Sequence, residues 1–136
     1  MEKVNKAGKT AVDRHKKQVE LARLSMASFM SNSKWEKFFI AIKNSEISLH
    51  GEIIKNVADD AIRPFNLKKD GLYIFNGKHH RYSTNDSGGG PVFYRDIEWI
   101  FVPPHNDING LKNLIDSLGL YEYDFSEDGM KIYGYK

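Results

Sequence analysis

Residues 91–103 hold the densest run of β-favouring residues in the chain, Pro-Val-Phe-Tyr-Arg-Asp-Ile-Glu-Trp-Ile-Phe-Val-Pro. Branched and aromatic side chains suit a pleated surface, whereas the glycines at 88–90 and the prolines at 103–104 mark where strand pairing stops. Strict alternation would place Phe93, Arg95, Ile97, Trp99 and Phe101 on one face and Val92, Tyr94, Asp96, Glu98, Ile100 and Val102 on the other. We expect the first face, with Trp99, to meet packed helices. The run therefore predicts a central strand of an antiparallel sheet.

Three stretches show the helical spacing of apolar residues. The first is an N-terminal stripe formed by Val12, Val19, Ala22, Met26, Phe29 and Met30. The second covers about residues 34–43, with Ser33 and Glu36 at the spacing of a capping box. The third starts after Asn106 or Asp107, which can cap it, and ends at Gly119. We expect the first two to be separate helices, or one helix kinked at residues 31–33.

Three further stretches predict strands. Residues 46–57 alternate as a strand does, although residues 53–62 also fit a helical face. We expect a strand to about Val57, because glycine and asparagine at positions 51 and 56 disfavour a helix. Asn-Gly at 76–77 predicts a two-residue hairpin turn that pairs Phe75 with Lys78 and Tyr73 with His80. Residues 121–135 predict a C-terminal hairpin that turns at 126–129.

The order of these elements indicates the fold class. Strands joined by hairpins cannot form a doubly wound parallel sheet. We therefore expect an α+β fold, a mostly antiparallel β-sheet with N-terminal helices and one helix near the C-terminus packed on one face. Residues 1–30 are expected to form a basic helical arm, and residues 31–136 a single α+β domain.

The amino-acid composition excludes several kinds of chemistry for this chain. The 136 residues contain no cysteine, which excludes disulfides, thiol catalysis and cysteine-ligated zinc and is compatible with a reducing cytoplasm. No signal peptide or membrane span is visible, so we expect a cytoplasmic protein without membrane contact. The formal net charge is +2, but residues 1–23 hold seven Lys/Arg against three acids. The basic character therefore belongs to the N-terminal arm.

Two groups of polar residues are candidates for chemistry. His79-His80-Arg81 suggests a metal or general-base site, but adjacent strand residues point to opposite faces, which favours polar positions on a hairpin. Asp96 and Glu98 lie one strand repeat apart and could hold a divalent cation or form an acid–base pair. Pairing with basic residues of neighbouring strands is the more common role of such carboxylates. We therefore expect neither a metal nor a cofactor.

A glycine-rich segment, residues 83–90, precedes the central strand. It shares only its glycines with a phosphate-binding loop, since it lacks the Lys-Ser/Thr and opens a strand instead of a helix. We expect a mobile connector. The binding residues that we predict lie around this connector and in the arm: Tyr73, His80, Arg81, Tyr82 and Tyr94, with Lys16 and Lys17.

Short motifs suggest one resemblance. They are Lys34-Trp35 followed by Phe39 at a helix start, and Gly-Pro-Val at 90–92 leading into Ile-Glu-Trp-Ile at 97–100. This pattern resembles a group of small stand-alone bacterial domains of unknown function over about residues 33–103, and it implies no activity or catalytic residue. The expected architecture is also similar in type to the immunity proteins that neutralise bacterial toxins.

The sequence supports three functions. The first is a non-enzymatic bacterial protein-binding module, for which a toxin-immunity protein is the candidate type, because no complete set of nucleophile, base and orienting group is present. The second is nucleic-acid binding led by the basic arm, with strand aromatics available to stack on bases. The third is a metal-assisted hydrolase that uses Asp96, Glu98 and His80 or His105. Whether the chain associates with a second copy stays open.

Overall fold

A computed structural model describes residues 26–57, 60–75, 78–80, 82–85 and 91–136, with the backbone alone at 73–75 and 78–80. The predicted helical stripe at 12–22, and with it most of the arm, lies outside these residues. The elements in chain order are α2 (Asn32–Asn44), β1 (Ile53–Asn56), β2 (Ile62–Pro64), α3 (Leu67–Asp70), β3 (Tyr73–Phe75), β4 (Lys78–His80), the 3-10 turn η1 (Tyr94–Asp96), β5 (Ile97–Val102), α4 (Ile108–Leu118), β6 (Tyr123–Ser126) and β7 (Gly129–Tyr133).

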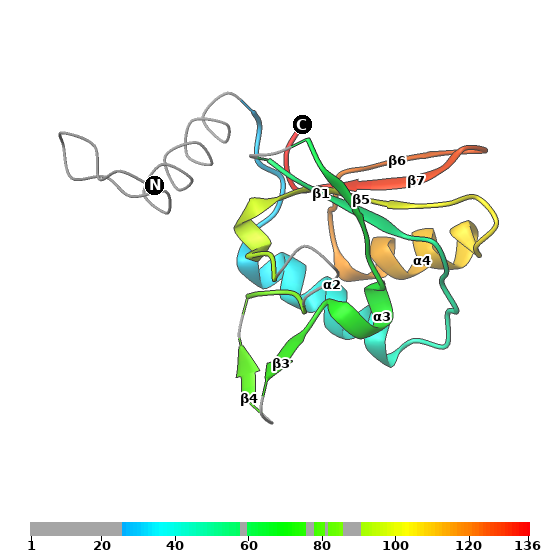
Figure 1. Cartoon of the computed structure of the whole chain (residues 1–136). Coiled ribbons are helices and arrows are strands. Elements are labelled where there is room, and N and C mark those ends of the chain that lie inside the picture. The colour runs from blue at the N-terminus through cyan, green and yellow to red at the C-terminus, as the bar shows by residue number, and fades with distance from the viewer. Residues whose placement is uncertain (1–25, 58–59, 76–77, 81, 86–90) are drawn as a thin grey trace, which may run out of the picture.

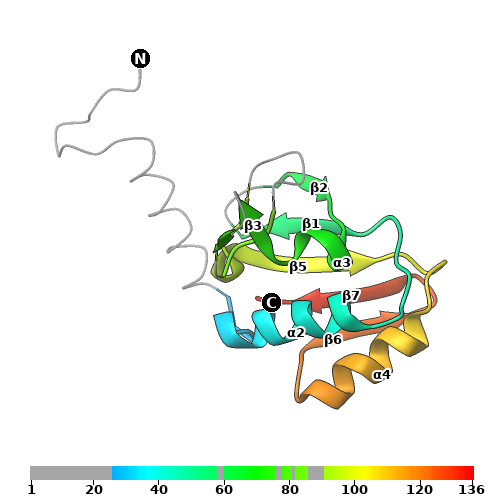
Figure 2. The ribbon, with the colours of Figure 1, turned by 90° about the horizontal axis from the view of Figure 1, so that it is seen from below.

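The main sheet has five antiparallel strands in the order β2-β1-β5-β7-β6. Figures 1 and 2 show α2 and α4 on the same side of this sheet. This arrangement confirms the predicted α+β class. Because β5 lies third of five, it is the central strand that the sequence predicted.

The core forms where α2 and α4 meet one face of the sheet. Helix α2 buries Trp35, Phe38, Phe39 and Ile42, and α4 buries Ile108, Leu111 and Ile115. These side chains pack on strand residues Ile54, Ile97, Ile100, Val102, Met130 and Ile132. Each large apolar side chain that is fully buried contributes about 1.5–3 kcal/mol to folding. This helix-side core therefore holds α2 and α4 against one face of β1, β5 and β7.

Each of the two long helices starts at a residue whose side chain accepts a backbone N–H of the first turn. Ser31, and not Ser33 as predicted, caps α2, and its hydroxyl accepts the backbone N–H of Lys34 at 3.1 Å. The helix therefore starts two residues earlier than the capping-box spacing indicated. At α4 the prediction is confirmed, because the Asp107 carboxylate accepts the N–H of Gly110 and the helix ends at Gly119.

Strand β5 differs from the regular strand that the sequence predicted. Residues 94–96 form a 3-10 turn, and the pairing with β1 shifts so that Lys55 lies opposite Trp99 while Asn56 lies opposite Ile97. Glu98 is thus an extra residue, a β-bulge, which reverses the side-chain alternation. Ile100 and Val102 therefore face the helices, whereas Trp99 faces the other side. The predicted orientation of Trp99 toward the helices is wrong.

The hairpins were predicted more accurately than the segment at 46–57. Strands β3 and β4 pair in the expected register, with Phe75 opposite Lys78, but they form a separate two-stranded sheet. The C-terminal hairpin is confirmed as β6 and β7. Of the strand predicted at 46–57, only β1 at Ile53–Asn56 forms. Residues 46–52 are irregular, and Gly51 among them adopts a φ of +80°.

The start of the predicted mobile connector is ordered and buried. Thr84 is fully buried and exchanges bonds with Val92, donating its backbone N–H and accepting the N–H of Val92 at its hydroxyl. Ser83 forms a bridge with Phe93. The expectation of mobility is therefore wrong for residues 83 and 84, and the part at 86–90 lies outside the described residues.

Candidate functional site

The predicted aromatic binding residues do not form one surface. Tyr94 is 0% exposed, and its hydroxyl donates to the carbonyl of Gly71 at 2.6 Å. Its ring packs 5.1 Å from Phe39 and 6.2 Å from Tyr82, centroid to centroid. Burial raises the pKa of the Tyr94 hydroxyl well above its usual range, and the charge of Glu36 adds to the effect. Tyr94 is therefore a core residue, which corrects its placement among the surface anchors, and Tyr82 is partly buried beside it.

Two of the other predicted binding residues lie in the β3–β4 hairpin, and three lie outside the described residues. Tyr73 and His80 lie opposite one another in the β3–β4 hairpin, which extends away from the main sheet in Figure 1. Arg81, Lys16 and Lys17 lie outside the described residues. Their role in binding stays a prediction.

The predicted carboxylate pair is separated by the bulge. Glu98 forms an ion pair with Lys55 across the β1–β5 pairing, with 2.7 Å between Nζ and Oε1. Asp96 ends the 3-10 turn instead of lying on a strand. No three His, Asp or Glu side chains in the described part of the chain come close enough to hold a metal ion. Glu98 therefore has the ion-pairing role that is the more common one for such carboxylates.

The side of the sheet opposite the helices carries two rows of paired residues, which together we call the open face. One row crosses the strands as Ile62, Lys55, Trp99, Tyr133 and Glu122, and the next as Pro64, Ile53, Phe101, Lys131 and Asp124. No described helix covers these rows, as Figure 1 shows. The centre of the open face is thus aromatic, and charged residues lie among and around the rings.

Lysines cover the aromatic centre. The Lys131 ammonium lies 4.6 Å from the ring centroid of Trp99, and the Lys136 ammonium lies 4.9 Å from that of Tyr133. Such cation–π contacts are worth about 0.5–1 kcal/mol at exposed positions. Trp99 is 9% exposed, and the Lys131 side chain is one of the groups that lie over its ring. This side chain is flexible and can move aside at low cost.

Hydrogen bonds fix the rim of the open face near β6. The Tyr133 hydroxyl donates to Asp124 at 2.6 Å, and Lys136 lies within 3.7 Å of Asp124 and 3.4 Å of Glu122. Partial burial, together with the bond to Asp124, raises the pKa of Tyr133 to about 12. The same bond lowers the pKa of the Asp124 carboxyl. These interactions hold the Tyr133 ring in place beside Trp99.

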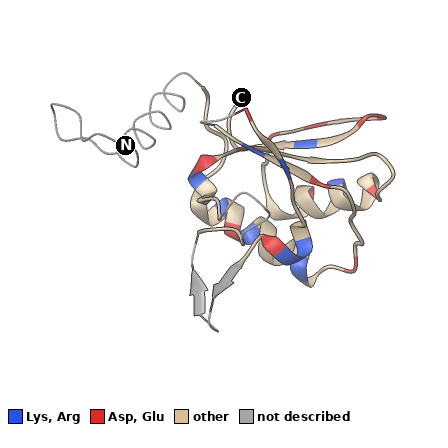
Figure 3. Ribbon diagram, viewed as in Figure 1, with Lys and Arg blue, Asp and Glu red and all other residues tan. Residues whose placement is uncertain are grey.

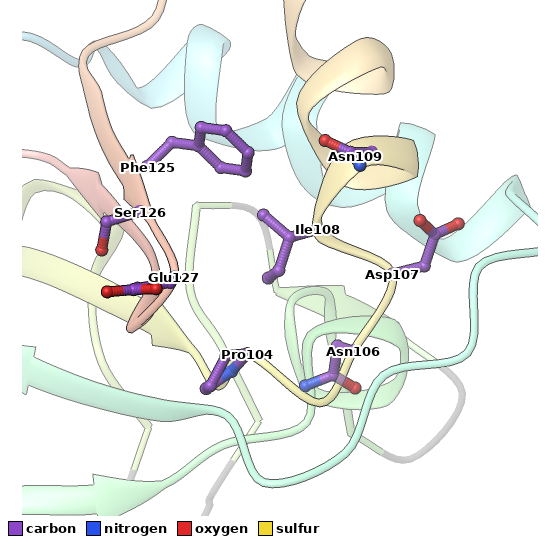
Figure 4. A pocket seen from close by; sticks show the side chains of 8 residues that line it. All are labelled: Pro104, Asn106, Asp107, Ile108, Asn109, Phe125, Ser126 and Glu127. Atoms are coloured by element: carbon purple, nitrogen blue, oxygen red, sulfur yellow. The ribbon is translucent and has the colours of Figure 1, made fainter.

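A hollow of about 380 Å³ lies between the first turn of α4 and the end of β6. Figure 4 shows the side chains of Ile108 and Phe125 directed into it, while the Asp107 carboxylate points away to cap the helix. Polar groups of Asn109 and Glu127 stand around the hollow. An apolar floor with a polar rim is typical of a site that takes one apolar side chain.

A second hollow, of about 290 Å³, lies beside β2 and α3 and is lined partly by His50, Glu52 and Asp70. Glu52 is 3% exposed, and its carboxylate accepts the backbone N–H of Leu67 at 2.8 Å. Asp70 accepts the backbone N–H of Asn66. Both acids therefore hold the short turn into α3, which is a structural role.

Sequence reasoning missed the open face because the alternation of residues 97–101 conceals the bulge. A signal was nevertheless present, since Glu98 interrupts an otherwise apolar run at 97–102. The segment at 131–136, in which two tyrosines lie between two lysines, was a second signal.

The comparisons with known proteins do not extend this picture. No protein-family model matches the chain, and neither a curated protein nor a solved structure matches it. Among the described helices, none combines the length and the apolar character needed to cross a bilayer.

Proposed function

We propose that this protein is a non-enzymatic protein-binding module that uses the open face, and that its partner class is the one the sequence suggested, a bacterial toxin neutralised by an immunity-type protein. The observation that carries the proposal is the aromatic centre of the open face, formed by Trp99, Phe101 and Tyr133 and left without a covering helix in the described chain. Trp and Tyr dominate the binding energy of protein interfaces. A polar rim around such a centre is the usual anatomy of an interface.

The charge of the open face favours a protein over a nucleic acid. Three lysines, Lys55, Lys131 and Lys136, are balanced by three carboxylates, those of Glu98, Glu122 and Asp124. Lys55 pairs with Glu98, and Lys136 pairs with Glu122 and Asp124. A nucleic-acid surface gains affinity from excess positive charge and the release of counterions. A balanced face offers little of that gain, whereas it suits a partner with its own mixed charges.

The test is capture of a partner by the tagged full chain at native expression, compared with two matched variants. Ile62→Lys places a charge on the open face at a residue that is 54% exposed, and Ile40→Lys makes the same change on α2 at a residue that is 42% exposed. We expect a stoichiometric protein to be retained by the wild type and by Ile40→Lys and lost with Ile62→Lys. Recovery of no such protein, or equal loss with both variants, would count against the proposal.

Nucleic-acid binding is kept as a second candidate because aromatic rings and lysines alternate on the open face. It predicts affinity for single-stranded RNA or DNA that falls steeply with salt, with the basic residues of the arm, Lys16 and Lys17 among them, supplying the excess charge. Binding that is undetectable or insensitive to salt would end this candidate.

A further inference from the structure

Strand β6 forms one edge of the main sheet, and no other described strand pairs with its outer side. The N–H of Tyr133 donates to the carbonyl of Glu122 across the β6–β7 pairing. Hydrogen-bonding pairs alternate along antiparallel strands, so the backbone groups of Tyr123 and Phe125 point away from β7. Those groups are available to a strand added at this edge.

The hollow beside α4 adjoins this edge. Phe125 is 45% exposed, and its ring points with Ile108 into the hollow, as Figure 4 shows. Phe125 lies opposite Met130, which is fully buried, so its side chain is on the helix side of the sheet. Every second side chain of a strand added to β6 would point to that same side. One apolar side chain of such a strand can therefore enter the hollow.

The negative charge near the β6 edge favours an added strand that is positively charged. Of the six acids at 104–128, Asp116 pairs with Lys112, and Glu122 and Asp124 pair with Lys136. Figure 3 shows acidic residues along the β6–β7 hairpin. Glu127 and Asp128 are exposed at its turn. Two copies of this edge would repel one another, which disfavours pairing between identical chains. An extended segment rich in lysine or arginine would be attracted.

We propose that the β6 edge, with its adjoining hollow, binds an extended basic segment of a partner protein by strand addition, with one apolar side chain of that segment in the hollow. Main-chain hydrogen bonds to Tyr123 and Phe125 would supply affinity, and the acids and the hollow would supply selectivity. This surface is separate from the centre of the open face. Failure of either proposal therefore leaves the other standing.

The experiment uses labelled eight-residue probe peptides of alternating lysine and valine, titrated into the full-length protein and followed by fluorescence anisotropy. Two further peptides carry backbone N-methyl groups on either the odd or the even residues. Strand addition uses the N–H groups of one edge only, so we expect one N-methylated peptide to bind about tenfold or more weakly and the other to bind like its parent. Equal affinity of the two N-methylated peptides would overturn strand addition.

Matched protein variants test the site. Glu127→Lys reverses an exposed charge beside the hollow, and Asp60→Lys reverses an exposed charge just before β2, at the opposite edge of the main sheet. We expect the first to weaken the parent peptide on the order of fivefold and the second to leave its affinity unchanged. Equal effects of the two variants on peptide affinity would overturn the assignment to a basic segment. So would a wild-type dimer that the peptide does not displace and that Glu127→Lys strengthens.

Discussion

Replacing Tyr94 by phenylalanine tests whether this residue belongs to the core or to a binding surface. The change removes one hydroxyl that donates to the Gly71 carbonyl at 2.6 Å, within a side chain that is 0% exposed. A buried acceptor that loses its partner costs about 1–2 kcal/mol of stability. For a chain of this length, a loss of that size lowers Tm by about 4–8 °C. We therefore expect Tyr94→Phe to be folded but clearly less stable.

Urea unfolding followed by tryptophan fluorescence measures the loss, and Tyr123→Phe is the matched control. The Tyr123 hydroxyl also makes a short hydrogen bond, 2.7 Å to Asp116, but at an exposed site where water can replace it. We expect the control to lose less than about 0.5 kcal/mol. If Tyr94→Phe were as stable as the control, the placement of Tyr94 in the core would be refuted.

Three other changes have defined outcomes. Gly134→Ala is expected to destabilise the fold by about 3 kcal/mol or more in urea unfolding, because a Cβ there would lie 2.1 Å from the Ile97 carbonyl oxygen, and wild-type stability would refute this packing. Asp107→Ala should cost about 1 kcal/mol in the same assay, whereas an unchanged midpoint would show that the α4 cap is dispensable. In a titration of tyrosinate absorbance, Tyr133 should ionise near its raised pKa of about 12, and the free energy of unfolding should fall as pH rises from about 10 through that value. Asp124→Asn should lower the pKa of Tyr133, because it removes the carboxylate that accepts the hydroxyl proton. An unchanged pKa in this variant would contradict the bond between the two side chains.

The parts of the fold that the sequence predicted well are those set by local chemistry. Asn-Gly at 76–77 gave the register of the β3–β4 hairpin, and Asp107 and Gly119 gave both ends of α4. Each of these signals depends only on residues that are close to one another in the sequence. The cap of α2 was misplaced because Ser31 and Ser33 are equally suitable cap residues in sequence, and the structure uses Ser31.

The candidate surfaces were harder to predict because they depend on long-range pairing. Tyr94 was expected at the surface, yet the buried partner of its hydroxyl, Gly71, lies 23 positions away in the sequence. Likewise, the acids around β6 are spread from 107 to 128 and become neighbours of a single edge only after α4 packs against the sheet. Residue types alone do not show such proximity.

The bulge at Glu98 connects the fold to the proposed binding surface. Without it, regular alternation would place Ile97 and Ile100 on opposite faces, and the helix side would lose one of two fully buried isoleucines. The extra residue allows both to face the helices, and in consequence Trp99 and Phe101 turn outward. The Lys131 side chain then lies over the indole, and the Lys136 side chain lies over the neighbouring Tyr133 ring. Because each such contact is worth only about 0.5–1 kcal/mol, a partner can displace the lysines and reach the ring, while the unbound face stays covered.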